Sequence, residues 1–273
     1  MPAFSYADIL GDRAVTAFDM RNIILTRDTR HQRVHITSHP VHGKSLFLDG
    51  THQSSEEDEW IYHEMLVHPA MQHFGEPSEV AIIGSAEGAG LREILRYPSV
   101  RNAHMCDIDE ELIDICRSTL GWDKGAMNDS RSRVIGGDGV KWLKSRDGGS
   151  LDVLIFDLLE PDSAQLSDHF YTPAILHLAS AKLSTRGIFA THAGPCHNAC
   201  VNSVAATYRA VSKVFPHVRL SLCPELRWAY IIASLTEFRG EPYRPVAGIS
   251  YYNRQLHDTF GSVIPEYLVE AIR

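Results

Sequence analysis

The distribution of apolar residues changes near residue 54. Before that point, apolar residues alternate or cluster in short runs, and a hairpin-type break lies at His42 and Gly43. Short apolar runs separated by turn residues predict strands, so we expect a small antiparallel β domain over residues 1–54. The strand candidates lie around Asp19–Thr26, Gln32–Ser38 and Lys44–Leu48.

A helix is predicted at the start of the second part, residues 55–273. Ser55 opens a capping-box-like sequence, and apolar residues then recur at roughly helical spacing from Glu59 to Phe74. We expect this helix to link the β domain to the rest of the chain.

From Glu79 onward, short apolar strands alternate with amphipathic helices. The expected strands are Val80–Ile83, Ala103–Asp107, Val134–Ile135, Val153–Asp157 and Gly187–His192, and the expected helices run through Leu91–Arg96, Glu110–Leu120, Val140–Lys144, Pro173–Leu183 and Val201–Val214. This alternation predicts an α/β, Rossmann-like domain with a mainly parallel sheet and helices on both faces. Two last strands, Val218–Leu222 and Trp228–Ser234, are expected to form the antiparallel pair that closes a class I methyltransferase-type sheet.

The composition narrows the classes of function. The 273 residues are 44% hydrophobic and 22% charged, as in ordinary globular proteins, and no apolar run approaches the roughly 20 residues of a membrane-spanning helix. Residues 1–12 lack the features of a secretion signal and the five cysteines suit reduced thiols, so we expect a cytoplasmic protein. The net charge of -8 argues against a general nucleic-acid binder and favours a cationic small molecule.

Glycines and acidic residues follow three successive predicted strands. Gly84 opens the turn Gly-Ser-Ala-Glu-Gly-Ala-Gly, whose small residues let the backbone approach a ligand at the start of a helix. Asp107 ends the next strand about 20 residues later, where a carboxylate can accept hydrogen bonds from both hydroxyls of a ribose. Asp138, between Gly137 and Gly139, follows the third strand and could accept from an adenine amino group. Together these positions predict a nucleoside site.

The nucleoside pattern fits both a nicotinamide dehydrogenase and an enzyme that uses a sulfonium nucleoside. From Gly84 to Gly90 the spacing is Gly-x-x-x-Gly-x-Gly, which is closer to a methyltransferase-type loop than to the Gly-x-Gly-x-x-Gly of dinucleotide enzymes. The spacing therefore favours a sulfonium of the S-adenosylmethionine type.

The motifs taken together resemble the spermidine and spermine synthase family, the polyamine aminopropyltransferases. The resemblance begins at Gln32 and covers nearly the whole chain. Its most specific run is Asp58–Pro69, and it also includes Leu48–Gln53, the turn at Gly84 and Phe156–Pro161. The family's fold, an N-terminal β domain joined to a Rossmann-like catalytic domain, agrees with the division near residue 54. The resemblance also implies a homodimer or homotetramer.

The resemblance implies decarboxylated S-adenosylmethionine as co-substrate, with no permanently bound cofactor. Asp107 would bind the ribose of this donor, and Asp138 with Gly139 its adenine. Glu87 stands where the family usually has Asp, and a carboxylate there attracts the aminopropyl ammonium while it repels the carboxylate of intact S-adenosylmethionine. The full set of implied donor-binding residues is Gln32, Gln53, His63, Gly84, Glu87, Asp107, Asp138 and Gly139.

The acceptor would be a di- or polyamine. A primary amine with a pKa near 10.4, about that of lysine, needs a base before it can attack, and Asp157 matches the first acid of the family's Asp-x-x-Asp-Pro. The residues that the resemblance places at the amine are Tyr62, Glu160 and Glu225. The sequences around Asp157 and over Thr191–Pro195 are closer to the thermospermine synthase-like branch, and Glu160 replaces the family's second Asp. These departures imply a longer or atypical acceptor.

Three rival interpretations remain. Intact S-adenosylmethionine could instead donate a methyl or a 3-amino-3-carboxypropyl group to an amine on the same fold, although Glu87 speaks against it. A catalytically silent polyamine or nucleoside binding protein is conceivable because Ser85 and Ala86 alter the family's glycine loop. A zinc site could be formed by His192, Cys196, His197 and Cys200, but no second cysteine pair supports it, so we expect a packed junction and no metal.

Overall fold

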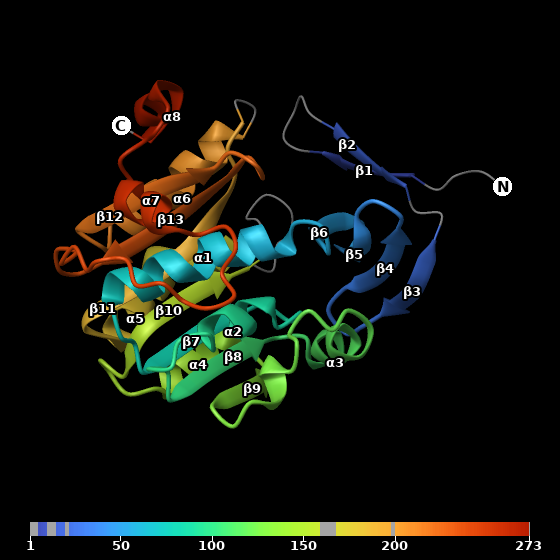
Figure 1. Ribbon diagram of the computed structural model, residues 1–273, viewed down its shortest axis with the longest axis horizontal. Coiled ribbons are helices and arrows are strands. Elements are labelled where there is room, and N and C mark those ends of the chain that lie inside the picture. The colour runs from blue at the N-terminus through green and yellow to red at the C-terminus, as the bar shows by residue number, and fades with distance from the viewer. Residues whose placement is uncertain (1–4, 10–14, 20–21, 159–167, 198–199, 273) are drawn as a thin grey trace.

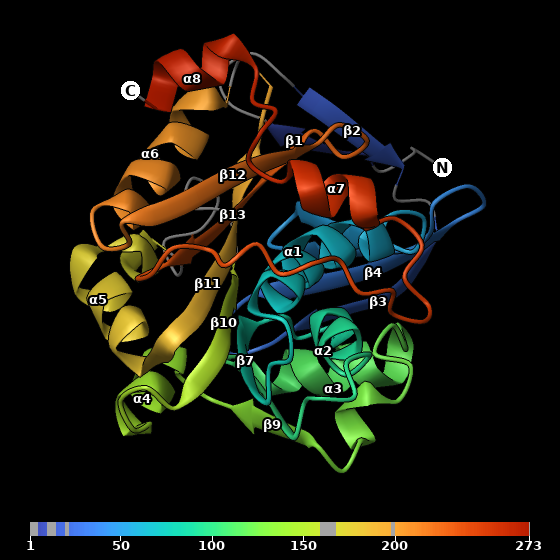
Figure 2. The same ribbon diagram turned by 60° about the vertical axis from the view of Figure 1, so that its left-hand side comes forward.

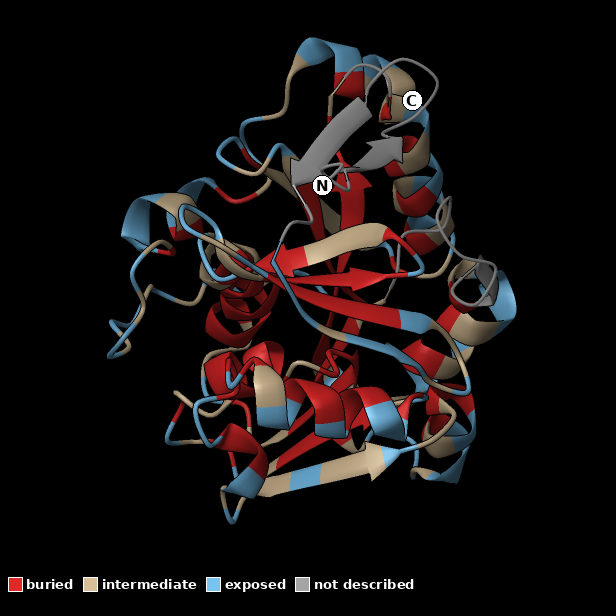
Figure 3. Ribbon diagram, turned by 90° about the vertical axis from the view of Figure 1, so that its right-hand side faces the viewer, coloured by how far each residue is buried: buried red, intermediate tan, exposed pale blue. Residues whose placement is uncertain are grey.

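The strands in the described part of the chain form three sheets (Figure 1). The computed structural model describes residues 5–9, 15–19, 22–158, 168–197 and 200–272. Two of the sheets are small and lie before residue 56, and the third is a seven-stranded sheet that carries the rest of the fold. Figure 3 shows that buried residues concentrate in the strands of the large sheet and in the helix faces packed on it.

The N-terminal part is antiparallel, as predicted. β1 (Ser5–Ile9) pairs with β2 (Val15–Asp19), and a separate four-stranded sheet has the order β3 (Ile23–Asp28), β4 (Arg33–His39), β5 (Gly43–Leu48) and β6 (Thr51–Ser55). The strand expected around Asp19–Thr26 is confirmed for Ile23–Thr26, which belongs to β3, whereas Asp19 is the last residue of β2, and the two strands pair with different partners. Strand β6 was missed, since its sequence Thr-His-Gln-Ser-Ser has no apolar alternation.

The linking helix has the expected bounds but not the expected cap. Helix α1 spans Glu59–Phe74, and its N-cap is Asp58, whose side chain makes no capping bond to the helix. Ser55 Oγ instead donates a 2.6 Å hydrogen bond to Asp58 Oδ1, so the predicted capping box was wrong. The domain boundary at residue 54 stays a prediction, and the four-stranded sheet ends one residue later at Ser55.

The large sheet has the predicted methyltransferase-type order. Its strands are β7 (Glu79–Gly84), β8 (Asn102–Asp107), β9 (Ser132–Gly136), β10 (Leu151–Asp157), β11 (Leu183–Pro195), β12 (His217–Cys223) and β13 (Trp228–Ser234). They are arranged β12-β13-β11-β10-β7-β8-β9. Neighbours from β9 to β11 pair parallel, whereas β13 pairs antiparallel with both β11 and β12. The carboxyl ends of the parallel strands therefore lie at one edge of the sheet.

Helices cover both faces of this sheet (Figure 2). One buried cluster joins the sheet to α1, α2 (Ala89–Ile94) and α3 (Glu110–Thr119). The other joins it to α4 (Gly139–Ser145), α5 (Pro173–Lys182) and α6 (Val201–Ser212). Short 3-10 helices lie at Ala126–Asn128 and Asp168–Tyr171, and α7 (Arg254–Thr259) and α8 (Glu266–Ile272) complete the chain.

The segment that follows β13 packs back onto the α1 side of the sheet (Figure 2). Glu64 of α1 accepts hydrogen bonds from the backbone N–H groups of Ser250, Tyr251 and Tyr252, at 2.8, 2.6 and 2.9 Å. This segment thus braces the helix that carries Tyr62 and His63. Among the described residues, no helix is both long and apolar enough to cross a membrane.

Candidate active site

A cavity of about 250 Å³ lies where the carboxyl ends of β7, β8 and β10 meet the small four-stranded sheet. Leu46 and Leu48 of β5 line it from the small sheet, and Ile83 lines it from the large one. Nine of the predicted site residues line this cavity: Gln32, Gln53, Tyr62, Gly84, Glu87, Asp107, Asp138, Gly139 and Asp157. Residues from both parts of the chain therefore converge on one site.

The turn after β7 requires its first glycine. Gly84 has a φ of 90°, and a Cβ at this position would lie 1.8 Å from the backbone oxygen of Asp157. Only glycine lets β7 and β10 approach this closely while the chain enters a left-handed conformation. Ser85 follows with a φ of 71°, which is uncommon for a residue with a side chain. The altered loop thus keeps the glycine that sets the distance between the two strand ends.

The ribose candidate Asp107 sits at the end of β8. Its Oδ1 accepts a 2.9 Å hydrogen bond from the backbone N–H of Asp109. Burial, together with the carboxylates of Glu87 and Asp109, raises the pKa of Asp107 to about 7, although the hydrogen bond from the Asp109 N–H acts in the opposite direction. The adenine candidate Asp138 caps α4, since its Oδ1 accepts from the backbone N–H groups of Val140 and Lys141. Both carboxyl groups border the cavity.

The two glutamines come from the small sheet and its turns. Gln32 Nε2 donates a 3.0 Å hydrogen bond to Asp109 Oδ2, and Thr29 Oγ1 donates to the same oxygen at 2.6 Å. These bonds tie the small sheet to the start of α3. Gln53 Nε2 donates to the backbone oxygen of Thr51 at 3.2 Å. Both glutamines therefore line the cavity from the small sheet and its turns, whereas Asp107 lines it from the end of β8.

Tyr62 and Asp157 meet at the inner end of the cavity. Tyr62 donates a 2.9 Å hydrogen bond from its phenol to Asp157 Oδ1, while Asp157 Oδ2 is buried without a hydrogen-bond partner among the described residues. Burial raises the pKa of Asp157, and the carboxylate of Glu87 raises it further, while His63 and His192 oppose them. Burial also raises the pKa of Tyr62 well above its usual value, so its phenol stays protonated.

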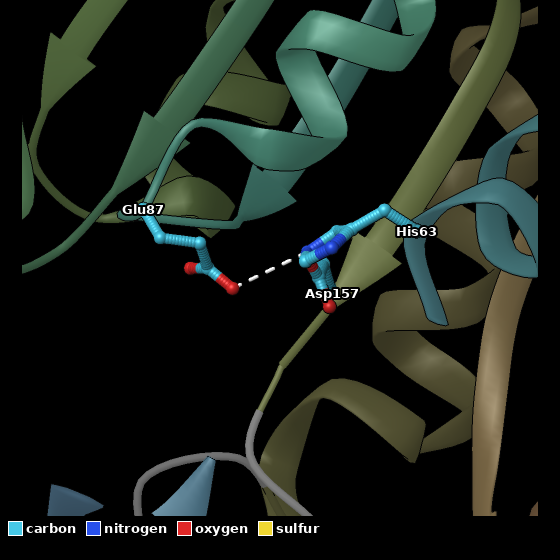
Figure 4. Close-up of side chains that lie close together, drawn as sticks. All are labelled: His63, Glu87 and Asp157. Carbon is cyan, nitrogen blue, oxygen red and sulfur yellow. Dashed lines mark ion pairs between the residues drawn. The ribbon is translucent and has the colours of Figure 1, made fainter. Parts of the chain in front are cut away.

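His63 is not among the residues that line the cavity, and it is fully buried. Its Nε2 is 3.3 Å from Glu87 Oε1 and 3.8 Å from Asp157 Oδ2. Its Nδ1 is 2.6 Å from the backbone oxygen of Glu59 and 3.2 Å from Glu59 Oε2. Figure 4 shows the side chains of His63, Glu87 and Asp157 converging from α1, from the turn after β7 and from the end of β10.

This histidine and the two carboxylates are also the group in the described part of the chain that lies close enough together to surround a metal ion. Both nitrogens of His63 face oxygen atoms, however, which is the environment of a protonated imidazole rather than of a metal ligand. We therefore interpret the group as an ion cluster and assign no metal ligand in it.

Of the other residues expected at the amine, the structure describes Glu225 but not Glu160. Glu225 is exposed and is not among the cavity residues, because the hydroxyl of Tyr251 donates a hydrogen bond to its carboxylate on the surface. The arrangement gives no support to an amine contact by Glu225, which stays an untested prediction. Glu160 lies outside the described residues.

The chain segment considered for zinc contributes to the cavity instead. His192 lines the cavity, and its Nε2 donates a 2.6 Å hydrogen bond to the backbone oxygen of Leu158. Burial lowers the pKa of His192, against the effect of Asp157. In the described residues, His192, Cys196, His197 and Cys200 do not come together as a possible metal site.

Sequence reasoning missed several residues of the site. His192 was considered only as a possible zinc ligand and as part of a motif that resembles one branch of the family, and no role at the substrate was given to it. Trp228 and Phe170 also line the cavity, and no local pattern distinguishes them from core aromatics. The pairing of Arg92 with Glu59 was missed as well, although two guanidinium nitrogens each lie 2.9 Å from one oxygen of this carboxylate. Sequence spacing cannot reveal this contact, because the two residues belong to different helices.

Comparisons with known proteins agree with this geometry. Residues 59–236 match the family model described as the spermine/spermidine synthase domain. The chain is 37% identical over 203 residues to polyamine aminopropyltransferase 1 of Hyperthermus butylicus, covering 73% of this chain and 69% of that protein. It is 32% identical over 263 residues to the polyamine aminopropyltransferase of Thermococcus onnurineus, covering 93% and 92%.

A plant relative and a solved structure extend the comparison. The chain is 31% identical over 242 residues to a thermospermine synthase of Arabidopsis thaliana, covering 85% of this chain and 70% of that protein. A crystal structure of a spermidine synthase in complex with the transition-state analogue AdoDATO superposes with a TM-score of 0.91 at 26% identity, covering 100% of this chain and 96% of the other. The chain therefore belongs to the spermine and spermidine synthase family, the polyamine aminopropyltransferases.

Proposed function

We propose that this enzyme transfers the aminopropyl group of decarboxylated S-adenosylmethionine to a polyamine, with Asp157 as the base. The observation that carries the proposal is the position of Tyr62, Glu87 and Asp157 at the end of a cavity whose other walls suit a nucleoside. The solved relative bound to a transition-state analogue supports the same type of reaction.

The donor would lie along the carboxyl edge of the large sheet. Asp107 would accept hydrogen bonds from its ribose hydroxyls, and Asp138 with Gly139 would meet its adenine. Gln32 and Gln53 would close over it from the small sheet. This placement leaves the aminopropyl chain directed at Glu87, whose carboxylate favours an ammonium and disfavours the carboxylate of intact S-adenosylmethionine.

The chemistry needs one proton transfer. Asp157 takes a proton from the ammonium of the acceptor, and the freed nitrogen attacks the methylene next to sulfur. The C–N bond forms as the C–S bond breaks, and its electron pair leaves on sulfur, giving the neutral thioether methylthioadenosine. Burial and Glu87 raise the pKa of Asp157, which makes its carboxylate a stronger proton acceptor, and Tyr62 holds the other oxygen in place. The sulfonium is already activated, so the remaining contribution of the protein is positioning.

The acceptor is proposed to be longer than putrescine, with at least one internal secondary amine. The observation behind this is in the sequence, where Glu160 replaces the family's usual second Asp and the motifs around Asp157 are closer to the thermospermine synthase-like branch. Similarity to a plant thermospermine synthase supports it. The test compares kcat/KM for putrescine, spermidine and longer amines in the wild type and in Glu160→Asp. If putrescine is the best substrate and the substitution leaves the ranking unchanged, the proposal on acceptor length is wrong.

We also propose a cytoplasmic homodimer or homotetramer. Ile23 and Ile24 on the edge strand β3 are 46% and 49% exposed, an apolar edge that a second copy could cover. Light scattering of the purified protein tests this, and a monomer at all concentrations would contradict it.

The decisive experiment for the reaction uses purified enzyme with each donor and a panel of amines. Mass spectrometry would identify both the nucleoside and the amine product. We expect methylthioadenosine and an aminopropylated amine from the decarboxylated donor. Adenosylhomocysteine from intact S-adenosylmethionine would instead indicate a methyltransferase. Methylthioadenosine from intact S-adenosylmethionine, together with a carboxyl-bearing amine product, would indicate 3-amino-3-carboxypropyl transfer. No product from either donor would indicate a binding protein.

A further inference from the structure

Both ring nitrogens of His63 face oxygen acceptors in the substrate-free enzyme. Nδ1 faces the backbone oxygen and the carboxylate of Glu59, and Nε2 faces the carboxylates of Glu87 and Asp157. A neutral imidazole carries a proton on only one nitrogen and would leave the other lone pair against an oxygen. The geometry is therefore that of an imidazolium, which has a proton to donate on each side.

A buried ion pair between Arg92 and Glu59 supports a positive charge on His63. Arg92 binds Glu59 through two nitrogens at 2.9 Å each, and the Arg92 Nε also donates to Glu93 at 2.7 Å. The fixed Glu59 carboxylate then faces Nδ1 of His63. Burial works against a charge on His63, but the hydrogen-bonded carboxylate of Glu59 and the carboxylate of Glu87, 3.3 Å from Nε2, outweigh it and hold the pKa of His63 well above its usual value.

The proton on His63 Nε2 lies where the ammonium of the proposed donor would bind. Glu87 and Asp157 are largely buried, with side chains 13% and 8% exposed, and they flank the His63 Nε2. An ammonium that binds to these carboxylates would lie beside a charged imidazolium in a site with little solvent. Two like charges at contact distance in a site with little solvent repel strongly. This repulsion favours loss of the proton from the imidazolium of His63.

We propose that in the substrate-free enzyme the protonated Nε2 of His63 occupies the position between Glu87 and Asp157 that the donor's ammonium takes on binding. Donor binding expels this proton to solvent. Glu59 and Arg92 are positioning residues for His63. This inference rests on the proposed function, because it takes the donor to carry an ammonium. After the exchange, His63 keeps the proton on Nδ1, bound to Glu59, and its Nε2 lone pair accepts a hydrogen bond from the ammonium.

The groups around His63 determine how the exchange can be measured. Glu59 and Tyr62 face it from its own helix, Glu87 from the turn after β7, and Asp157 from the end of β10. Arg92 of α2 acts on it through Glu59. A second source of protons is Asp107, because the ribose of any nucleoside ligand would require its charged form. A nucleoside without the ammonium therefore provides the reference.

The experiment is calorimetry of the wild type with decarboxylated S-adenosylmethionine and with methylthioadenosine, each in buffers of different ionisation enthalpy. Both ligands carry the same ribose and adenine, so the contribution of Asp107 is common to them. Near neutral pH we expect the donor to release close to one proton more than methylthioadenosine. By linkage, the affinity for the donor relative to methylthioadenosine should also increase as the pH is raised, by up to about tenfold per pH unit over the range below the pKa of His63.

Three variants make the result specific. His63→Gln should abolish the excess proton release, and Glu59→Gln should reduce it while donor binding at alkaline pH is retained. His73→Gln removes another buried histidine of α1, whose Nε2 lies 3.3 Å from a guanidinium nitrogen of Arg219 and not at the cavity, and it should leave the excess unchanged. Because folding of each variant can be checked by its binding of methylthioadenosine, a loss of folding would be recognised.

Two results would overturn the inference. One is equal proton release with both ligands in the wild type, and the other is an excess that persists in His63→Gln. If the excess proton release is the same in Glu59→Gln as in the wild type, Glu59 and Arg92 do not act as positioning residues. A wild type that binds methylthioadenosine but not the decarboxylated donor would overturn the proposed donor instead, which separates the two failures.

Discussion

The phenol of Tyr62 donates a 2.9 Å hydrogen bond to Oδ1 of Asp157, while Oδ2 of the same carboxylate is buried, has no hydrogen-bond partner among the described residues and lies 3.8 Å from His63 Nε2. The two residues are far apart in the sequence and are brought together because α1 packs against β10. The bond fixes the orientation of the carboxylate. It also favours the charged form of the carboxylate, which is the form that a base requires.

Asp157→Asn should lower kcat by about 10²–10⁴-fold, because the amide preserves the shape of the side chain but cannot accept the amine's proton. The affinity for methylthioadenosine should be largely unchanged, since this product contacts the nucleoside part of the site. Steady-state kinetics and calorimetry measure the two effects. Asp147→Asn is the matched control at an exposed position. Activity of Asp157→Asn close to that of the wild type would remove the residue from the role of base.

Tyr62→Phe should have a smaller effect, a loss of about 10–100-fold in kcat, the range for one hydrogen bond to a charged group. The pKa of Asp157 is raised by burial and by Glu87, and loss of the phenol should raise it further. The acidic limb of the kcat/KM profile should therefore move to higher pH. If the profile of Tyr62→Phe coincides with that of the wild type, the hydrogen bond does not set the charge of Asp157.

Asp107→Asn should weaken the binding of methylthioadenosine and remove part of its pH dependence. Burial, together with Glu87 and Asp109, raises the pKa of Asp107 to about 7, so the acid is increasingly protonated below that pH. A protonated carboxyl group offers fewer acceptors to the two ribose hydroxyls. Affinity of the wild type should thus fall by up to about tenfold per pH unit below pH 7. A pH-independent affinity in the wild type would contradict the ribose contact.

The strand-end residues could be predicted from sequence because parallel strands bring their carboxyl ends to one edge. Gly84, Asp107 and Asp157 each follow an apolar run of the expected length, and the structure lines one cavity with all three. The fold class followed from the same alternation. The residues that sequence missed depend on contacts between elements. Arg92 reaches Glu59 from a different helix, and the charged state of His63 becomes visible only when both of its nitrogens can be inspected.

Glu225 shows the opposite error. Its neighbourhood in the sequence suggested an amine contact, but hydrogen bonds from two nearby side chains orient its carboxylate. Tyr251 and Cys223 both donate hydrogen bonds to its Oε2, and the residue is exposed. Position along the chain gave no information about these partners, because Tyr251 comes from the C-terminal segment that packs back onto α1.

Glu87→Gln should reduce the preference for decarboxylated over intact S-adenosylmethionine by about 1.5–3 kcal/mol, the scale of a hydrogen bond to a charged group. The amide keeps the size of the side chain but no longer attracts the donor's ammonium or repels a carboxylate. The measurement is the ratio of the two binding constants in wild type and variant, with Glu111→Gln as an exposed control. An unaltered ratio would show that another group selects the donor.

The last prediction concerns the support of the site by the C-terminal segment. Glu64 is 2% exposed, and its two oxygens accept three backbone N–H groups, from Ser250, Tyr251 and Tyr252. In Glu64→Gln one oxygen becomes an amide nitrogen that faces N–H donors, so at least one backbone donor loses its partner. We expect the free energy of unfolding to fall by about 2–4 kcal/mol, from hydrogen bonds to a buried charge. Chemical denaturation followed by circular dichroism measures this loss.

Glu76→Gln provides the comparison for Glu64→Gln. Glu76 binds Arg244 at 2.7 Å, but its side chain is 76% exposed, and exposed ion pairs contribute only about 0–1 kcal/mol. Its removal should leave the unfolding curve almost unchanged. Because Tyr62 and His63 immediately precede Glu64 on α1, Glu64→Gln should also lower kcat at temperatures where the protein is still folded. If Glu64→Gln is as stable and as active as Glu76→Gln, the three backbone bonds do not brace the catalytic helix.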